Sequence, residues 1–496
     1  MKLSTTVLAQ LQQQQAIAIP RYDRGKTGIG IVHIGPGAFH RAHQAVYTEN
    51  AMNQSGGDWG ICGVSLRSSS ARDILSTQDF LYTLAIRDKT TRYQIIGAIK
   101  EILVAGEQSD AILSRLSAAT TKIVSLTITE KAYCLNALGS LDLEHPDIAA
   151  DLDNPRHPQS AIGFLVEGLR LRLASGVTAF TVLSCDNVSG NGDKLRRGVL
   201  DYARLIDEDL AGWISGNVAF PNSMVDSITP KTEDDTITSV SSAIGAQDDW
   251  PIQREAFTQW VIEENWSGER PDWQGVGVIF TNDVEGFEKA KLRLLNCLHS
   301  TLAYAGSLAG FETVYEATSD TRFRQFISGL AQNEIIGSFV PPRELDIGKY
   351  SQEIITRFLN PEIQHRLAQI AWDGSQKIQM RILPVIRDNL AADRPIRGLC
   401  MALASWFEFI CRALTSGHEI NDPLANTFSQ MPALRDGDPA VVVESFLSID
   451  AIFASDLRHN TLVLQQLTQS LRTLRECAKG GQSVADALTM LPPASA

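Results

Sequence analysis

Apolar positions in the first part of the chain occur in short unbroken runs, and those in the last part recur at helical spacing. The runs at 29–34, 59–66, 122–128 and 178–183 predict strands buried on both faces, as in a parallel sheet. Further strands are predicted at 80–86, 93–99, 257–263 and 276–281, and helices at 39–52, 109–116 and 161–174. Alternating strands and helices predict an α/β domain with helices covering a sheet.

The strand pattern stops near Asp283, and almost everything after residue 284 is helical. Breaks are expected near 341–342, 360–361, 421–423 and 438–439, where proline interrupts the pattern. A chain of 496 residues is too long for one ordinary core. We therefore predict an α/β domain over 1–283 and a mainly α-helical domain over 284–496.

Composition narrows the partners and the compartment. A formal charge of −13 argues against nucleic acid or an anionic membrane as the main partner. The longest apolar run, 398–414, carries Glu408 and Arg412 and predicts a core helix rather than a membrane span. The seven cysteines include no CxxC pair, which indicates free thiols and no zinc site, and glutamines at 12–15 interrupt any signal-like segment. A cytoplasmic protein is expected.

The run at 29–34 ends in a glycine turn that opens a helical segment. Gly35, Gly37, Ala38 and Phe39 lie where backbone amides of a dinucleotide fold face a pyrophosphate. The usual third glycine is replaced by His40, so the glycine pair alone is a weak signal, and an ordinary turn is the alternative.

The end of the next strand usually carries an acidic residue that binds the ribose of NAD. Here Arg67 and Ser69 stand in that region, with no carboxylate directly after Leu66. An arginine and serines accept a 2′-phosphate as readily as a hydroxyl. The choice between NAD and NADP therefore stays open at this point.

Polar residues also follow the later strands of the sheet. Glu130 comes after 122–128, and Asn187 comes after 178–183, at the edge where parallel sheets bind ligands. Asn187 would stand beside a substrate or nicotinamide, or it would close a turn through its own backbone hydrogen bonds. Residues 220–226, which include Val225 and Asp226, are predicted to be another such loop.

The segment 288–304 carries the strongest candidate chemistry. It contains no glycine or proline and predicts a helix with Lys291, Asn296 and His299 within an arc of roughly 140° at about 100° per residue. Leucines share this arc, so the three polar groups should be buried and should meet one another or a ligand. Burial lowers the pKa of a lysine, which suits it to act as a base. A surface lysine beside a core histidine is the alternative.

Four motifs together resemble the mannitol dehydrogenase family of long-chain, metal-free polyol dehydrogenases. They are the turn and helix start at 35–44, Ser184-Cys185-Asp186-Asn187, Met224-Val225-Asp226, and Lys291-x4-Asn296-x2-His299. The resemblance covers essentially the whole chain, with the motifs in the family's order and spacing. It implies an N-terminal Rossmann-like NAD(P)-binding domain, a helical C-terminal domain and an active site between them.

The resemblance also implies the role of each residue. Lys291 would take the alcohol proton as hydride leaves, Asn187 and Asn296 would hold the developing alkoxide, and His299 would orient the substrate. Cofactor contacts would come from Gly35, Gly37, Ala38, Phe39, Arg67, Ser69, Val225 and Asp226. Glu130, Gln369 and Lys377 would bind substrate or relay protons.

Departures from the family pattern leave the substrate open. The front half is most like mannitol 2-dehydrogenases, which interconvert mannitol and fructose. The stretch 369–377 is more like fructuronate reductases, since mannitol dehydrogenases tend to have arginine in place of Gln369. The expected reaction is that of mannitol 2-dehydrogenase, with that of fructuronate reductase as the alternative, and the substrate is a small polyol, ketose or hexuronate. A cofactor-binding protein without turnover is the non-enzyme alternative.

Two further expectations concern the cofactor and metals. NAD is expected, with NADP discriminated against by about tenfold or less because no carboxylate follows Leu66. A zinc-dependent mechanism is not favoured, because the nine histidines include no ligand-spaced pair with a cysteine.

Overall fold

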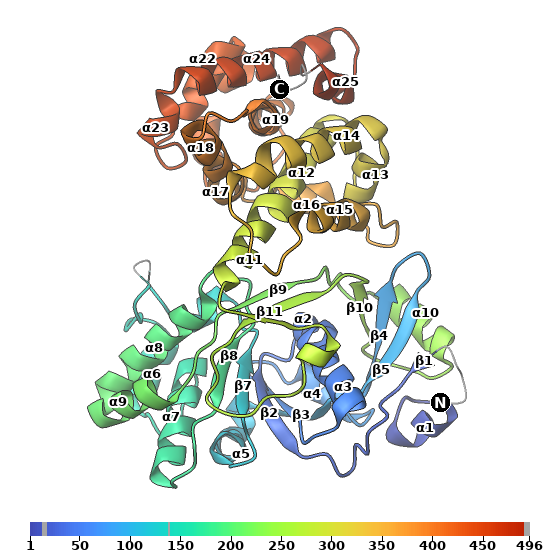
Figure 1. Cartoon of the computed structure of the whole chain (residues 1–496), viewed down its shortest axis with the longest axis vertical. Helices are drawn as coiled ribbons and strands as arrows, with labels where there is room; N and C mark the ends of the chain where they lie inside the picture. The colour runs from blue at the N-terminus through green and yellow to red at the C-terminus, as the bar shows by residue number, and fades with distance from the viewer. Residues whose placement is uncertain (12–16, 137–138, 491–496) are drawn as a thin grey trace. The chain divides into compact units, whose positions relative to one another are not determined.

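The computed structural model describes residues 1–11, 17–136 and 139–490. The glutamines at 12–15 lie outside the described residues. The chain folds into two compact units, Met1–Glu285 and Gly286–Ala496. Figure 1 shows strands only in the first of these units and helices throughout the second.

The first unit is built around a five-stranded sheet in which every neighbouring pair is parallel. The strand order is β6-β3-β2-β7-β8. In chain order within this sheet that is 3-2-1-4-5, which is characteristic of a doubly wound dinucleotide-binding domain. The strands are β2 (Ile29–Ile34), β3 (Gly60–Ser65), β6 (Ile99–Val104), β7 (Ile123–Leu126) and β8 (Thr181–Ser184). The predicted α/β fold is confirmed.

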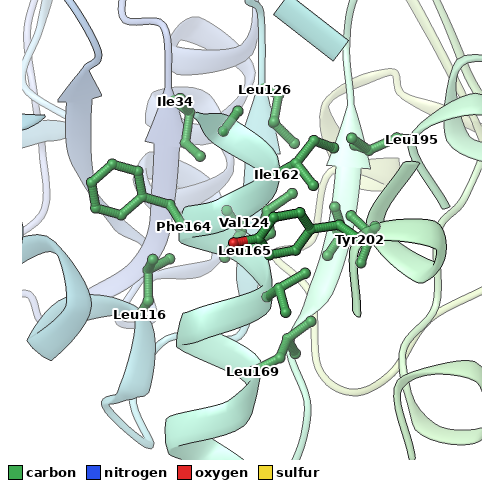
Figure 2. Close-up of a cluster of buried hydrophobic side chains, with 14 of the residues drawn as sticks. Ile34, Leu116, Val124, Leu126, Ile162, Phe164, Leu165, Leu169, Leu195 and Tyr202 are labelled. Atoms are coloured by element: carbon green, nitrogen blue, oxygen red, sulfur yellow. The ribbon is translucent and has the colours of Figure 1, made fainter. Parts of the chain in front are cut away.

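Helices cover this sheet because both of its faces are apolar. On one side, α7 (Ala161–Ala174) begins at Ser160, whose hydroxyl accepts from the amide of Gly163 at 2.9 Å. Figure 2 shows Ile162, Leu165 and Leu169 of α7 among side chains of the sheet and the neighbouring helices. The unit's helices are α1 (Thr5–Leu11), α2 (Ala38–Ala42), α3 (Gln44–Ser55), α4 (Ser70–Ser76), α5 (Ala105–Ser117), α6 (Pro146–Asp153), α7, α8 (Asn191–Ile206), α9 (Glu208–Asn217) and α10 (Asp234–Ile244), with the 3-10 turns η1 (Glu130–Tyr133) and η2 (Gln274–Val276).

Two smaller sheets complete the first unit. One has the order β1-β5-β4-β10 and the other β12-β11-β9. Their strands are β1 (Ile17–Ala18), β4 (Tyr82–Arg87), β5 (Arg92–Ile96), β10 (Ile252–Glu255), β9 (Ser223–Asp226), β11 (Gln259–Glu263) and β12 (Ile279–Thr281).

Three local predictions were wrong. The strand predicted at 93–99 ends at Ile96, and Ile99 begins β6, which belongs to the other sheet. The helix predicted at 39–52 breaks at His43, whose backbone is not helical (φ −125°, ψ −85°). Residues 223–226 form β9 rather than a loop, because β11 pairs with them in antiparallel register. That partner lies more than thirty residues further along the chain, so no local pattern reveals it.

The second unit consists of packed helices. The central helix α19 (Arg397–Ser416) packs against α12 and α24. The helices are α11 (Val284–Lys291), the π-helix η3 (Leu292–Asn296), α12 (Cys297–Leu308), α13 (Val314–Ser319), α14 (Thr321–Leu330), the π-helix η4 (Ala331–Ile335), η5 (Ile336–Ser338), α15 (Ile347–Phe358), α16 (Leu367–Ala371), α17 (Gly374–Arg381), α18 (Leu383–Ala391), α19, α20 (Ala425–Ser429), α21 (Ala433–Asp436), α22 (Pro439–Leu447), α23 (Ser455–Arg458), α24 (Thr461–Lys479) and α25 (Val484–Thr489).

Helix α19 was predicted to be a core helix, and its burial agrees with this. Within the described part of the chain it alone has the length and apolar composition to cross a membrane, and 72% of its most apolar window is buried inside the protein. Such burial is what the core helix of a folded domain shows.

Candidate active site

The glycine turn after β2 is shaped by two different requirements. Gly35 has φ +91°, and a Cβ there would lie 2.3 Å from the carbonyl oxygen of Thr127. Gly37 is exposed, and a Cβ there would meet nothing closer than 3.9 Å. Packing within the chain therefore explains Gly35 but not Gly37. An open, exposed glycine at a helix start fits close approach of a pyrophosphate to the backbone.

His40, which stands in place of the third glycine, packs against His33 of β2 beside the turn. Its ring stacks on that of His33 with centroids 3.4 Å apart, and both residues are buried. His33 is held by the hydroxyls of Ser125 at 2.8 Å and Thr127 at 2.9 Å. Burial lowers the pKa of His33 to about 3 and that of His40 well below its ordinary value. Both rings are therefore neutral near pH 7, and they brace the turn without adding charge.

A cavity of about 300 Å³ lies at the carboxyl ends of β2, β3 and β7. Its lining includes Gly35, Arg67 and Asp147, and the Arg67 guanidinium is paired with the Asp147 carboxylate. In this fold the end of the second strand is where the adenosine ribose binds. The cavity thus contains a carboxylate, although none follows Leu66 in the sequence.

Asp147 was missed by sequence reasoning because it lies on α6, eighty residues beyond Arg67. A Pro-Asp pair at a helix start is common, so no local signal separates it from a structural residue. Ser69 is not among the residues that line the cavity; it precedes α4, and a hydrogen bond involving its side chain lowers the pKa of Asp73.

The ends of β7 and β8 are tied together by Asp186. Its carboxylate accepts from the Thr129 amide at 2.8 Å and from the Tyr133 hydroxyl at 3.1 Å. Asn187, the next residue, is exposed at the carboxyl end of β8. Glu130 is exposed in η1 and pairs with Lys194 at 3.2 Å.

Val225 and Asp226 lie in β9, where both side chains are buried. The strand is fastened to the end of β8, because the Ser223 hydroxyl donates to the Ser184 carbonyl at 2.5 Å. The Asn191 amide group bridges the Asp186 and Ser223 carbonyls at 2.9 and 2.8 Å. Asp226 is thus held at the same edge of the first unit as Asn187.

In the second unit, Lys291 directly precedes a π-helical segment and Asn296 is its last residue. Helix α11 ends at Lys291, η3 spans Leu292–Asn296, and α12 starts at Cys297. A π turn has i→i+5 hydrogen bonds and holds about one residue more than an α turn. Residues five apart are therefore brought closer to one face than the roughly 140° predicted for a regular helix at 100° per residue. His299 follows Asn296 by three residues in α12, so the three side chains follow one side of the helix.

The surroundings of His299 leave one ring nitrogen for a ligand. The ring stacks on Phe358 at 4.6 Å and meets His365 edge-on at 5.4 Å. Nε2 is buried and has no hydrogen-bond partner among the described residues. Burial, and then the charges of Arg357 and Arg381 and the ring of His365, lower the pKa of His299 well below its ordinary value. Lys291 is buried as well, and Asn296 is partly exposed.

Helix α17 adds two cations beside these residues. Arg381 donates to the carbonyl of Asn296 at 3.5 Å and to the hydroxyl of Ser300 at 3.0 Å. Lys377 donates to the Ile370 carbonyl at 3.1 Å, and burial, followed by the charge of Arg381, lowers its pKa. Gln369 is exposed on α16. Arg381 was not predicted from the sequence. The available signal was its position four residues after Lys377, which places both cations on one side of a helix.

Both halves of the chain match family models. Residues 29–275 match the mannitol dehydrogenase Rossmann domain, and residues 283–475 match the mannitol dehydrogenase C-terminal domain. The chain belongs to the mannitol dehydrogenase family. It is therefore an oxidoreductase, and the predicted family is confirmed.

Individual members of the mannitol dehydrogenase family match over nearly their whole length. The chain is 40% identical to D-mannonate oxidoreductase of Escherichia coli, over 95% of this chain and 98% of that protein. It is also 40% identical to mannitol 2-dehydrogenase of Aspergillus fumigatus, over 96% and 97% of the two chains. The structure of Pseudomonas fluorescens mannitol 2-dehydrogenase in a ternary complex with NAD and D-mannitol matches with a TM-score of 0.80 at 34% identity, covering 99% of this chain and 100% of that one. Equal identity to two differently named relatives leaves the substrate unresolved.

Proposed function

We propose that the protein is an NAD-dependent, metal-independent dehydrogenase that interconverts a secondary alcohol and its ketone on an open-chain six-carbon sugar derivative. The observation that carries this proposal is the π-interrupted helix with Lys291, Asn296 and His299 along one side. The buried Nε2 of His299 has no hydrogen-bond partner among the described residues, and such an atom needs a polar ligand. A lysine base with amide donors provides the chemistry of alcohol oxidation.

Each residue has a defined task in this proposal. Lys291 takes the hydroxyl proton, while the bound nicotinamide supplies the hydride acceptor. The side-chain amides of Asn187 and Asn296 donate hydrogen bonds to the oxygen as it becomes an alkoxide. His299 is neutral, so it orients the substrate through Nε2 without a proton transfer of its own.

The first unit is proposed to hold NAD through Gly35, Gly37, Ala38 and Phe39, with Val225 and Asp226 at the nicotinamide end. The relative from Pseudomonas fluorescens is a complex with NAD. The open face at Gly37 and the cavity beside Arg67 fit a dinucleotide. Seven buried, unpaired cysteines support a reducing compartment, and we propose that the enzyme is cytoplasmic.

Two substrate pairs remain candidates. D-mannitol and D-fructose follow from the relative named mannitol 2-dehydrogenase, and D-mannonate and D-fructuronate from the relative named D-mannonate oxidoreductase. The contacts of Arg381 and Lys377, two cations without an ion-paired carboxylate among the described residues, favour the second pair.

A substrate panel tests the proposed function. Purified protein is given mannitol, fructose, mannonate, fructuronate and arabinitol, each with NAD(H) and with NADP(H), and absorbance at the reduced nicotinamide band is followed. Turnover of at least one pair with NAD(H) supports the proposal. Binding of NAD without turnover of any of these compounds would contradict it and would favour a cofactor-binding protein.

A further inference from the structure

Several buried polar atoms without partners gather around α12. Among the described residues, no hydrogen-bond partner is recorded for Nε2 of His299, the hydroxyl of Tyr304, Nδ1 of His365 or Nε of Arg381. Helix α12 carries the first two, Arg381 ends α17, and His365 precedes α16. Helix α12 packs against both α16 and α17. Orphaned polar atoms are rare in folded proteins, so their concentration at one place indicates a polar ligand.

The charge at this place is positive. Arg381 and Lys377 stand four residues apart on α17 and therefore share a side of that helix. Their recorded hydrogen bonds go to two carbonyls and one hydroxyl, and neither residue forms an ion pair with a carboxylate of the described chain.

The nearest acidic groups do not neutralise this pair. The charges of Asp373 and Asp422 raise the pKa of Lys377, but each does so by less than burial or the charge of Arg381 lowers it. The Asp422 carboxylate accepts from the amides of Ser375 at 2.7 Å and Leu424 at 2.8 Å, so its oxygens are already engaged.

Two partly buried cations without a carboxylate are costly unless an anion joins them. Arg381 and Lys377 are both partly buried, so their charged forms are less well solvated than in water, and this lowers the pKa of each. A bound carboxylate would replace the missing solvation with charge-assisted hydrogen bonds, and the planar guanidinium suits its geometry.

We infer that Arg381, supported by Lys377, recognises a terminal carboxylate of the substrate, so that the enzyme acts on an aldonate of the D-mannonate type in preference to a neutral polyol. This inference rests on the proposed function, because it assigns the far end of the same substrate. D-mannonate and D-mannitol differ only in having a carboxylate or a hydroxymethyl group at one terminal carbon. Arg381 is thus a specificity-determining residue, and it takes no part in proton transfer.

The test compares kcat and KM for D-mannonate and D-mannitol in the wild type and in Arg381→Gln, with saturating NAD⁺. The wild type should prefer mannonate by about a hundredfold or more in kcat/KM, as expected for a site built around a polar group. Arg381→Gln should lower kcat/KM for mannonate by about a hundredfold, mostly through KM, because the carboxylate is remote from the reacting carbon. The preference for mannonate over mannitol should then largely disappear. Arg381→Lys should keep part of the preference for mannonate, since lysine retains the positive charge but lacks the planar guanidinium that donates two hydrogen bonds to a carboxylate.

Two controls separate recognition from folding. Arg387→Gln removes an arginine from the next helix, where it pairs with exposed Asp456 at 2.6 Å, and should leave the mannonate-to-mannitol ratio unchanged. Thermal melting of Arg381→Gln shows whether loss of the bonds to Asn296 and Ser300 unfolds the helix pair. If that variant is unstable, Lys377→Gln is measured in its place and should also lower the ratio of kcat/KM for mannonate to kcat/KM for mannitol.

Three outcomes would overturn the inference. A wild type that prefers mannitol to mannonate contradicts it and leaves the proposed function intact. An equal loss on both substrates in Arg381→Gln would show that the residue supports structure only. Preference for mannitol 1-phosphate over mannonate would show that the cations serve a phosphate ester. Inactivity on every compound would instead contradict the proposed function itself.

Discussion

Burial, and then the charges of its neighbours, lower the pKa of His299 and keep its ring neutral near pH 7. It is buried among Phe358, His365 and two arginines, so an imidazolium would lose its solvation and would also face positive charge. Its pKa in the folded protein is therefore far below that in the unfolded chain. A neutral imidazole can orient a substrate oxygen. An imidazolium would instead compete with Lys291 as a proton donor to that oxygen.

This shift should appear in the pH dependence of stability. Because the folded pKa of His299 is lowered, the unfolded chain binds a proton below about pH 6.5 that the folded protein rejects, and stability falls as pH falls. His299→Asn should reduce the slope of the unfolding free energy against pH, between pH 6.5 and 5, by up to about 1.4 kcal/mol per unit.

Chemical denaturation at several pH values measures this slope. His459→Asn, which changes an exposed histidine, is the matched control. An unchanged slope in His299→Asn would contradict the neutral ring.

Individual side chains were predictable where chemistry and spacing coincide. Lys291, Asn296 and His299 could be proposed as site residues because unusual polar residues share the apolar face of one predicted helix. Asp147, His365 and Arg381 were not found, because each reaches its neighbours only through packing of distant segments. A sequence pattern shows which residues share an element, and it does not show which elements meet.

The π segment between α11 and α12 is the element-level feature that composition did not reveal. Leucine-rich sequence favours a regular helix, and nothing in residues 292–296 marks a wider turn. A π turn costs local helix stability and persists where packing or function maintains it. Here it draws Asn296 toward the face that carries Lys291, and η3 is held by packing against α15 and α17.

The loop after β3 and the start of α6 meet at the cofactor cavity. The predicted discrimination of tenfold or less rested on a loop without a carboxylate, and Asp147 now supplies one from elsewhere. Its charge repels a 2′-phosphate, and its pairing with Arg67 occupies the cation that would attract one. The pair is partly exposed, so its own contribution to stability is small.

Removing this carboxylate should favour NADP. Asp147→Asn should lower the ratio of Kd for NADP⁺ to Kd for NAD⁺ by about tenfold, since one close charge repulsion in a partly solvated site amounts to about 1.4 kcal/mol. Titration of protein fluorescence measures both constants without turnover. Glu144→Gln makes the same charge change on an exposed neighbour outside the cavity. Equal ratios in Asp147→Asn and the wild type would exclude Asp147 as the discriminating residue.

The fold of the whole chain followed from its sequence to a large extent. Continuous apolar runs identified β2, β3, β7 and β8, and the end of that pattern separated strand-rich from helical sequence. The short strands β9 and β10 were not predicted, because each is defined by pairing with a strand far away in the sequence. The substrate could not be predicted, since it depends on a few side chains from separate helices.

At the level of the intact protein, the mechanism is expected to need no metal ion. No group of three or more histidine, cysteine, aspartate or glutamate side chains placed to hold a metal occurs in the described ranges. Prolonged chelation followed by desalting should therefore leave the rate unchanged, because the lysine rather than a metal-bound water takes the proton. Activity that is lost to the chelator and restored by zinc would contradict this expectation.

Lys291 is proposed to be the general base of a dehydrogenase. The most direct test of this role is turnover of Lys291→Ala with saturating NAD⁺ and the best substrate of the panel, beside Lys289→Ala, which removes an exposed lysine from the same helix. We expect Lys291→Ala to lower kcat by about 10²- to 10⁴-fold with little change in the Kd of NAD⁺, and Lys289→Ala to behave as the wild type. A kcat of Lys291→Ala within tenfold of the wild type would contradict the account.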